Sequence, residues 1–538
     1  MTTAPNWNFG DILDALDASF PGDAPALIHG DQVTNWRDFG RRSNNLARAF
    51  VARGAVAGDK VAFYLRNRPE YCEALAASFK ARLVHVNVNY RYLDEELWYI
   101  LDNSDAKIVV FDADFADRVE KLRPRLPHVA AWIKVGDGPG EGESYEALAE
   151  AGDGRPLGVA RDGQDLLFLY TGGTTGMPKG VMWAANDLWH ALGAGANSPA
   201  NGGVPPATLE QHVANAVKAG PTTRQIPCCP LMHGTGLFTA IGTLVSGGCV
   251  ITLAGQKFES AELFDTVQKH QANSLVIVGD AFAKPMLNAL EENPGRWDIS
   301  SVKLVVSSGV MWSTEVKKGL LRHNGGMILT DSFGSSEAVG FGVSVMTAAG
   351  EVRTAKFTVG DRCKVFSEDH REIAPGSGEK GFIARSGPIP VGYYKDPDKT
   401  AKTFPTINGL RYSIPGDWCI VEADGTLTLL GRGSACINSA GEKIYPEEVE
   451  EALKTHPDVE DALVVGIPDD RWGNAVVGVV QLRSGAVADE EKLRAHVKER
   501  LAGYKVPKRV LAVPAMFRAP NGKADYKAAQ QHAAERYV

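Results

Sequence analysis

The sequence lacks any cysteine pattern that is typical of a metal site or a disulfide framework. Its seven cysteines are dispersed, and no two have the Cys-x-x-Cys spacing: they stand at positions 72, 228, 229, 249, 363, 419 and 436. An odd, scattered set is typical of a protein in a reducing compartment. We therefore expect these cysteines to be reduced core residues.

Long hydrophobic runs and an excess of positive charge are also missing. No stretch approaches the ~20 apolar residues of a membrane span, and the start of the chain lacks the basic and then apolar order of a signal peptide. The 57 Lys and Arg residues stand against 65 Asp and Glu residues, a formal net charge of -8. We therefore expect a cytoplasmic protein with no transmembrane segment and no nucleic-acid partner.

The sequence does contain short apolar runs that alternate with amphipathic stretches. The runs lie at 60–65, 107–112, 165–170, 274–279 and 303–308. Strands separated by helical patterns predict an α/β fold. Glycine-rich segments at 136–143 and 193–206 interrupt the pattern and are expected to be surface loops. A chain of 538 residues without an internal repeat predicts one large domain and a smaller one.

The pattern changes after about residue 432. Pro446 can start a helix that carries Val449 and Leu453, and a later helix would place Leu493, Val497 and Leu501 on one stripe. The segment 429–443 is rich in Gly and Ser, as a hinge between two rigid bodies would be. We predict an N-terminal domain over 1–431 and a small mobile α/β domain over 432–538, although an ordinary linker that never moves is the alternative.

The most informative segment runs from Tyr170 to Gly180. It follows an apolar run and contains four glycines, three threonines and one lysine. Glycine lets backbone amides turn toward an anion, threonine hydroxyls donate further hydrogen bonds and lysine adds a positive charge, so the pattern predicts a polyphosphate site. It is not a Walker A loop, because Lys179 stands between Pro178 and Gly180 instead of preceding Ser or Thr.

This loop resembles the signature of the adenylate-forming superfamily, which includes acyl-CoA synthetases, carrier-protein adenylation domains and luciferases. Further motifs follow in that family's order: Phe333-Gly-Ser-Ser-Glu337, Pro415-Gly-Asp417, Gly431-Arg432 and Asn521-Gly-Lys523. The resemblance implies a large domain of layered α/β sheets with a small β-barrel-like part, followed by the small mobile domain. The segments 389–397 and 519–526 resemble bacterial ligases that activate long-chain or steroid side-chain carboxylates.

The resemblance implies an AMP-forming acyl-CoA ligase that needs ATP, Mg²⁺ and coenzyme A. It makes an acyl-adenylate and pyrophosphate first and then transfers the acyl group to the CoA thiol, with a role in fatty acid metabolism or steroid degradation. The implied catalytic residues are Lys523, Glu337, Ser336 and His233, with Glu337 as the metal ligand. The implied ATP-binding residues are Thr171, Gly172, Gly173, Thr174, Thr175, Gly176, Lys179, Ser308, Gly309, Val310, Asp331, Ser332, Phe333, Gly334, Ser335, Asp417 and Arg432.

The resemblance also assigns residues to the second step and to the acyl group. The CoA site would contain Gly441, Lys443, Trp472, Tyr504 and Lys508, and the acyl pocket Met232, Gly234, Leu237 and Phe238. Three positions depart from the family pattern. Gly172 stands where the loop usually has Ser, and Ser434 stands at the hinge, where an acidic residue or lysine is common. Ala440 replaces a frequent glycine beside Gly441, where the added methyl group would narrow the pantetheine tunnel.

The sequence favours an apolar acid as the substrate. No acidic residue occurs between His233 and Gly248, where amino-acid-activating relatives place an aspartate. Apolar pocket residues suit a fatty acid or a ring system. Two alternatives stay open: an adenylating enzyme with another acceptor, such as a separate carrier protein, and a binding protein without turnover. The oligomeric state also stays open, with a homodimer as one alternative.

Overall fold

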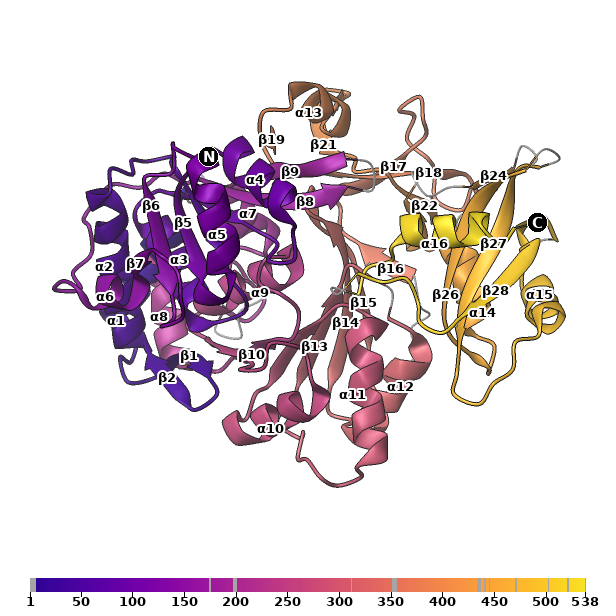
Figure 1. Cartoon of the computed structure of the whole chain (residues 1–538), viewed down its shortest axis with the longest axis horizontal. Helices are drawn as coiled ribbons and strands as arrows, with labels where there is room; N and C mark the ends of the chain where they lie inside the picture. Colours follow the sequence, from indigo (N-terminus) through magenta and orange to yellow (C-terminus); the bar gives the residue numbers. More distant parts are fainter. Residues whose placement is uncertain are drawn as a thin grey trace. The chain divides into compact units, whose positions relative to one another are not determined.

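The computed structural model describes residues 6–173, 176–196, 201–310, 312–350, 356–432, 437–439, 442–444, 446–469, 472–501, 503–519 and 522–537. The chain divides into two compact units (Figure 1). Unit 1 contains residues 1–354 and 385–413, and unit 2 contains residues 355–384 and 414–538. The domain boundary expected between 431 and 432 stays a prediction.

The first sheet of unit 1 has the strand order β19-β9-β8-β4-β3-β5-β6-β7. Pairing is parallel from β8 to β7 and antiparallel at β8–β9 and β9–β19. The strands are β3 (Lys60–Tyr64), β4 (Val84–Asn87), β5 (Ala106–Asp112), β6 (Ala131–Val135), β7 (Glu143–Ser144), β8 (Leu166–Gly173), β9 (Gly176–Ala184) and β19 (Gly392–Tyr393).

Helices cover both faces of this sheet because successive side chains of each strand point to opposite sides. In β3, Val61 and Phe63 pack toward one core cluster and Ala62 and Tyr64 toward another. The helices and 3-10 turns around it are α1 (Phe9–Ser19), α2 (Trp36–Ala52), α3 (Pro69–Lys80), α4 (Asp94–Asn103), η1 (Ala113–Phe115), α5 (Ala116–Leu122), η2 (Arg123–Arg125), α6 (Tyr145–Glu150), α7 (Ala185–Ala191) and α8 (Leu209–Ala219).

The part of the second, larger sheet that belongs to unit 1 includes the strand order β2-β1-β11-β10-β12-β13-β14-β15, in which the pairs β1–β2 and β14–β15 are antiparallel. Its strands are β1 (Pro25–His29), β2 (Gln32–Asn35), β10 (Arg224–Pro227), β11 (Cys249–Thr252), β12 (Ser274–Ile277), β13 (Leu304–Ser308), β14 (Ile328–Ser335) and β15 (Ala338–Met346). The helices that accompany it are α9 (Gly234–Leu244), α10 (Ser260–His270), α11 (Asp280–Glu292) and α12 (Thr314–His323). Unit 1 also contains α13 (Pro397–Thr403), β20 (Thr406–Ile407) and β21 (Leu410–Ser413).

Unit 2 begins with an antiparallel sheet of order β16-β23-β22-β18, with β17 beside β18. Its strands are β16 (Lys356–Val359), β17 (Cys363–Phe366), β18 (Lys380–Ser386), β22 (Asp417–Val421) and β23 (Leu427–Arg432). The hydrogen bonding of these described strands follows an open path, and this sheet stands where the barrel-like part was expected.

The rest of unit 2 is a small α/β body, drawn in yellow and light orange in Figure 1. The order β26-β27-β28 is packed with α14, α15 and α16, and β24 pairs with β25. The elements are β24 (Ile437–Ser439), β25 (Glu442–Ile444), α14 (Pro446–Lys454), β26 (Val459–Asp469), β27 (Gly473–Leu482), α15 (Glu490–Lys498), η5 (Gly503–Lys505), β28 (Arg509–Val513) and α16 (Tyr526–Ala534).

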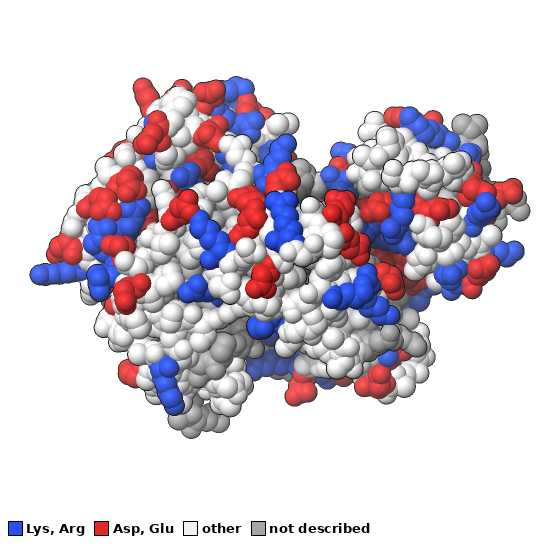
Figure 2. Space-filling view, turned by 90° about the horizontal axis from the view of Figure 1, so that it is seen from below, with Lys and Arg blue, Asp and Glu red and all other residues white. Residues whose placement is uncertain are grey.

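The structure confirms the expected fold class and the strands that the apolar runs predict. It also confirms the helix that starts at Pro446, whereas the later helix ends at Lys498, so Leu501 of the predicted stripe lies beyond the end of that helix. The six cysteines within the described residues are free thiols, and all except Cys363 are buried. On the face seen in Figure 2, basic and acidic side chains are interspersed.

Candidate functional site

The predicted phosphate loop connects the two strands of a β-hairpin. Tyr170 of β8 pairs with Gly180 of β9, and Thr171 pairs with Lys179. The base of the hairpin is also held from its other side, because the Tyr394 amide donates to the Gly180 carbonyl at 2.8 Å. Thr174 and Thr175 lie outside the described residues, but the strand pairing fixes where the loop begins and ends.

The lysine of the loop forms an ion pair within unit 1. The Lys179 ammonium contacts the Asp396 carboxylate, and both side chains are partly exposed. The hydrogen bond from Lys179 holds the pKa of Asp396 below its usual value. A phosphate group that enters the loop would therefore compete with Asp396 for this cation.

The Phe333–Glu337 motif covers the end of β14 and the two-residue turn to β15, where Ser335 pairs with Ala338. Glu337 is only 9% exposed. Its Oε1 atom accepts a hydrogen bond of 2.7 Å from the Tyr393 hydroxyl, and its carbonyl accepts one of 2.7 Å from Ser413 Oγ. A buried carboxylate with one fixed oxygen presents its remaining lone pairs in a defined direction.

Side chains of the first sheet tie this turn to the loop hairpin. Trp183 of β9 donates from Nε1 to the Ser336 carbonyl at 2.9 Å. Tyr393, which bonds to Glu337, pairs in β19 with Val181 of β9. The structure thus brings together two predicted motifs that are more than 150 residues apart in the sequence. Sequence reasoning did not identify Trp183 and Tyr393 as supporting residues. Tyr393 does lie in the segment 389–397, whose resemblance to bacterial ligases was the available signal.

The ends of β13 and β14 bring two predicted ATP-binding segments side by side, 308–310 and 331–335. Ser308 pairs with Ser332, and Gly309 follows with a φ of +92°, a conformation that glycine adopts without strain. Phe333 is buried, and its ring lies 5.2 Å from that of Phe341. The family resemblance implies that Phe333 stacks on the adenine ring, and this role stays a prediction.

A buried ion pair lies beside these strand ends. The Lys317 ammonium contacts the Asp331 carboxylate, and Lys317 also lies 5.3 Å from the centre of the Trp312 ring. Burial raises the pKa of Asp331 to about 6 although Lys317 opposes this rise. Sequence reasoning missed Lys317, because its ion pair depends on the packing of α12 against β14.

Two asparagines hold the segment that precedes the predicted acyl pocket. Asn67 donates to the Pro227 and Cys229 carbonyls and accepts from the Leu231 amide at 2.7 Å. Asn87 donates to the carbonyls of Tyr170 and Met232 at 2.9 and 2.7 Å and accepts from the Tyr170 amide at 2.6 Å. Asn87 therefore links the loop hairpin to the pocket segment. A polar residue within the apolar run 83–88 was the signal that could have identified it.

The predicted pocket residues lie at the start of helix α9. His233 is its N-cap residue, and Met232, Leu237 and Phe238 are buried. Phe238 also packs edge-on against Trp183, with ring centres 6.3 Å apart. The structure thus places this wall against the strand that carries the phosphate loop.

In unit 2 two of the predicted ATP-binding residues pair across neighbouring strands. Asp417 of β22 pairs with Arg432 of β23, and Asp417 is 7% exposed. The antiparallel pairing therefore brings together two predicted motifs that are 15 positions apart in the sequence. Nothing is described for the side chain of Arg432.

Two of the predicted CoA-binding residues are in contact. The Lys508 ammonium lies 4.0 Å from the centre of the Trp472 ring, and Tyr504 is 40% exposed. A cation on an aromatic face is a suitable surface for a purine ring and a phosphate. Lys443 lies in β25 opposite Asn438. Ser434, Ala440 and Gly441 lie outside the described residues.

Lys523 stands at the end of a short turn in unit 2, and its side chain is exposed. The Ala519 amide donates to the Lys523 carbonyl, and the Gly522 amide donates to the Ala519 carbonyl, both at 2.8 Å. Gly522 has a φ of +81°, which a side chain would strain. The hydrogen bonds among Ala519, Gly522 and Lys523 therefore fix the backbone at the lysine of this motif.

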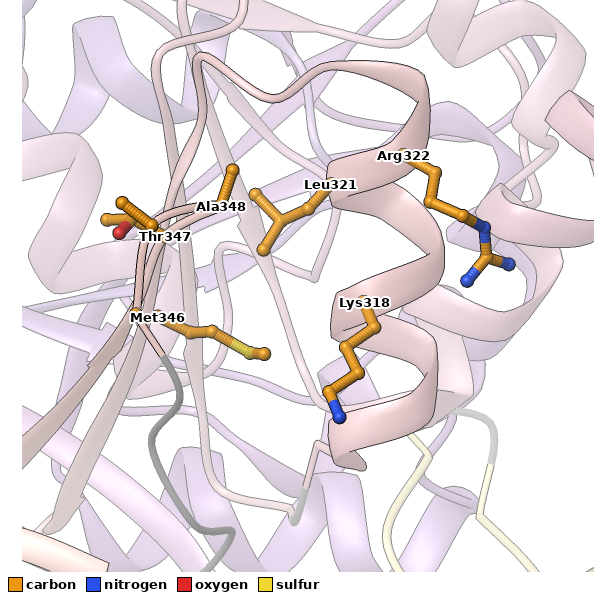
Figure 3. Close-up of a pocket in the computed structure, with 8 residues that line it drawn as sticks. Lys318, Leu321, Arg322, Met346, Thr347 and Ala348 are labelled. Carbon is orange, nitrogen blue, oxygen red and sulfur yellow. The ribbon is translucent and has the colours of Figure 1, made fainter.

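A cavity of about 330 Å³ lies away from these motifs, between α12 and the end of β15 (Figure 3). Arg322 on its rim forms an ion pair with Glu291 at 3.1 Å. None of the predicted site residues is among those that line it: Lys318, Leu321, Arg322, Met346, Thr347, Ala348, Ala349 and Gly350. We assign it no role in the chemistry.

Within the described part of the chain, no three or more His, Cys, Asp or Glu side chains gather in a way that could hold a metal ion. Across the described ranges, no helix combines the length and apolar character that spanning a membrane requires.

Comparison with known proteins identifies the family. The AMP-binding enzyme family matches residues 14–394, and the AMP-binding enzyme C-terminal domain matches residues 448–523. A Mycobacterium marinum protein named medium/long-chain-fatty-acid–CoA/3-oxocholest-4-en-26-oate–CoA ligase is 41% identical, with 97% of this chain and 96% of that protein covered. A Rhodococcus rhodochrous 3-oxocholest-4-en-26-oate–CoA ligase is 42% identical, with 97% and 95% covered.

Solved structures agree with this fold. The anthranilate CoA ligase AuaEII in complex with anthranoyl-AMP has a TM-score of 0.84 at 21% identity, with 99% of this chain and 98% of that chain covered. ATP-bound MatB from Rhodopseudomonas palustris has a TM-score of 0.82 at 23% identity, with 99% and 100% covered. The resemblance expected from the loop and the later motifs is therefore confirmed, and the chain belongs to the AMP-binding enzyme family of adenylate-forming enzymes.

Proposed function

We propose that the chain is an ATP-dependent, AMP-forming acyl-CoA ligase that acts on hydrophobic carboxylic acids. The observation that carries this proposal is its similarity, over 97% of its length, to proteins named as CoA ligases for medium and long-chain fatty acids and for a steroid side-chain acid. The loop hairpin and the Glu337 turn, which are bonded to each other within unit 1, support it, and so does the turn within unit 2 that carries Lys523.

In the first step the carboxylate attacks the α-phosphorus of ATP, and pyrophosphate leaves. Two anions must approach each other, so cations and fixed donors are required, each worth roughly 3–4 kcal/mol in comparable sites. The loop amides and Lys179 would bind the phosphates, Ser336 would contact the α-phosphate, and Asp417 would accept from the ribose hydroxyls. Lys523 would bridge the carboxylate and phosphate oxygens.

The residues present fit a magnesium ion that arrives with the nucleotide. Mg²⁺ is usually held by one or two carboxylates together with phosphate oxygens and water. Glu337 supplies one buried carboxylate whose orientation Tyr393 fixes. The ion would neutralise phosphate charge, and Glu337 would hold the ion beside the phosphates that the loop binds.

In the second step the CoA thiol attacks the acyl-adenylate carbonyl, and AMP leaves. A thiol with a pKa of about 8.5 is only slightly ionised at neutral pH, so positioning contributes much of the rate. Lys508, Trp472 and Tyr504 would bind the CoA nucleotide, and the segment around Gly441 would line the pantetheine arm. Rotation of the small domain about Ser434 between the steps belongs to this proposal.

A carboxylate panel tests the reaction and its substrate class. Pyrophosphate release and acyl-CoA formation would be measured with acetate, octanoate, palmitate and 3-oxocholest-4-en-26-oate, with and without CoA. We expect CoA-dependent turnover of the larger acids. A preference for acetate would contradict the substrate class. Pyrophosphate release without acyl-CoA would instead favour a separate carrier protein as acceptor, and no release with any acid would favour a binding protein.

Two lysine variants test the division of labour between the steps. Lys523→Ala should slow adenylate formation by about 100-fold or more and leave acyl transfer from supplied acyl-adenylate to CoA nearly unchanged. Lys508→Ala is the matched control, because it should raise the KM for CoA and spare adenylate formation. Equal losses of both half-reactions in the Lys523 variant would refute its role.

A cytoplasmic location, a homodimer and the absence of a nucleic-acid partner stay predictions.

A further inference from the structure

The turn that presents Lys523 is held by a side chain that none of the motifs contains. Arg518 lies just before the turn, and it forms an isolated antiparallel bridge with Ala524 on the other side. Its Nη1 atom donates to the Gly522 carbonyl at 3.0 Å. This hydrogen bond reaches the residue immediately before Lys523, at the point where the backbone takes its positive φ.

The Asp461 carboxylate of β26 also binds the Arg518 guanidinium. Arg518 donates from Nε and Nη2 to the two Asp461 oxygens at 2.5 and 2.8 Å, and both side chains are largely buried. Such a two-point pair sets the plane of the guanidinium as well as its position. Burial raises the pKa of Asp461, but Arg518 more than compensates, and the pKa lies below its usual value.

A second group of buried residues supports this pair. Glu450 of α14 is 4% exposed, accepts from the Val464 amide at 2.9 Å and is hydrogen-bonded to Tyr526, the first residue of α16. The charge of Glu450 also acts on Arg518. In Figure 1, helix α16 lies beside β26, so the turn is anchored on both of its flanks. The guanidinium is thus held by rigid elements and not by the turn alone.

We propose that Arg518 is a positioning residue for adenylate formation, which transmits the rigidity of β26 through Asp461 to the turn that carries Lys523. The inference rests on the proposed function of Lys523. The charge of a long, exposed lysine stabilises the reacting oxygens only weakly unless the backbone that carries the lysine is fixed. A misplacement of about 1 Å can lower the reaction rate on the order of 100-fold. Arg518 itself contacts no substrate in this proposal.

Half-reaction kinetics of Arg518→Ala test the proposal. We expect adenylate formation to fall by about 10- to 100-fold, with acyl transfer from supplied acyl-adenylate changed less than twofold. Because Arg518 acts through Lys523, the double variant Arg518→Ala/Lys523→Ala should form adenylate at the rate of Lys523→Ala alone. A further drop in the double variant, or equal loss of both half-reactions, would overturn the proposal.

Two more variants separate positioning from stability. Arg518→Lys keeps a cation beside Asp461, but a lysine cannot bind both carboxylate oxygens and the Gly522 carbonyl at once. We therefore expect this variant to have a Tm close to that of the wild type and a lower rate of adenylate formation. Leu493→Ala removes a core side chain of α15 in the same unit and should lower the Tm with no change in the ratio of the half-reactions. If Arg518→Lys forms adenylate like the wild type, the inference is wrong. If Lys523→Ala forms adenylate like the wild type, the proposed function of Lys523 is wrong, whatever the Arg518 variants show.

Discussion

At the scale of single residues, the hydrogen bond from Tyr393 to Glu337 links β19, which pairs with the loop strand β9, to the proposed metal ligand. Tyr393→Phe removes the hydroxyl and keeps the volume, so one charge-assisted hydrogen bond is lost. We expect a stability loss of about 1–3 kcal/mol and a higher Mg²⁺ concentration for half-maximal pyrophosphate release. Tyr145→Phe is the control, because Tyr145 bonds to Glu73 at 3.1 Å in another cluster. An equal shift in Mg²⁺ dependence for both variants would contradict the link.

A second residue, His85, makes the protein sensitive to acid. His85 is buried in β4, with Nε2 2.9 Å from the Tyr71 hydroxyl, and burial lowers its pKa from 6.5 to about 3. Below pH 6.5 the unfolded chain therefore binds a proton that the folded protein does not. The folded state thus loses stability as the pH falls from about 6.5 toward 3, by about 2 kcal/mol at pH 5.

Denaturation at pH 7 and pH 5 checks this prediction. His85→Gln cannot take up a proton in either state, so its stability should fall less between the two pH values than that of the wild type. Parallel curves for the two proteins would show that His85 is not the group responsible.

At the scale of elements, Asn87 joins β4, the loop hairpin and the segment before α9 by three hydrogen bonds. Asn87→Ala leaves buried backbone groups of Tyr170 and Met232 without these partners, at a cost of about 1–3 kcal/mol for each unpaired group. We expect a lower Tm together with a higher KM for both ATP and the carboxylate.

Asn45→Ala is the matched control for this element. Asn45 is also buried, and it donates to the Ala149 carbonyl at 2.8 Å and accepts from the Gly154 amide at 3.0 Å. Its loss should lower the Tm without a change in either KM. If the two variants alter the KM values alike, Asn87 has only a structural role.

At the scale of the whole molecule, the two units have separate hydrophobic cores. Leu101 packs in a core cluster of unit 1, and Leu493 packs in one of unit 2 with Leu453 and Val476. We predict two calorimetric transitions, because each core can be lost without the other. Leu101→Ala should lower the temperature of one transition and Leu493→Ala that of the other, because each variant loses about 2–5 kcal/mol from the free energy of unfolding of its own unit. A single transition that both variants shift would contradict this independence.

The sequence predicted strands well where local pattern decides burial. The runs at 107–112 and 303–308 became β5 and β13, because β-branched residues between turn signals fit a parallel strand that is covered on both faces. The end of α15 was less predictable: Leu501 continues the apolar spacing, but the regular helix stops at Lys498. A periodic pattern marks a buried face and does not by itself show where the backbone stops being helical.

The loop from Tyr170 to Gly180 and the motifs that carry Glu337, Asp417 and Lys523 were determined by the sequence alone, because turn chemistry and motif order depend on neighbouring residues. The tertiary structure decided which side chains support them. Trp183 meets Ser336, Asn87 meets Met232, and Arg518 meets Asp461 across 153, 145 and 57 positions of the chain. Such pairs depend on strand register and on the packing of one element against another, and no local pattern encodes them.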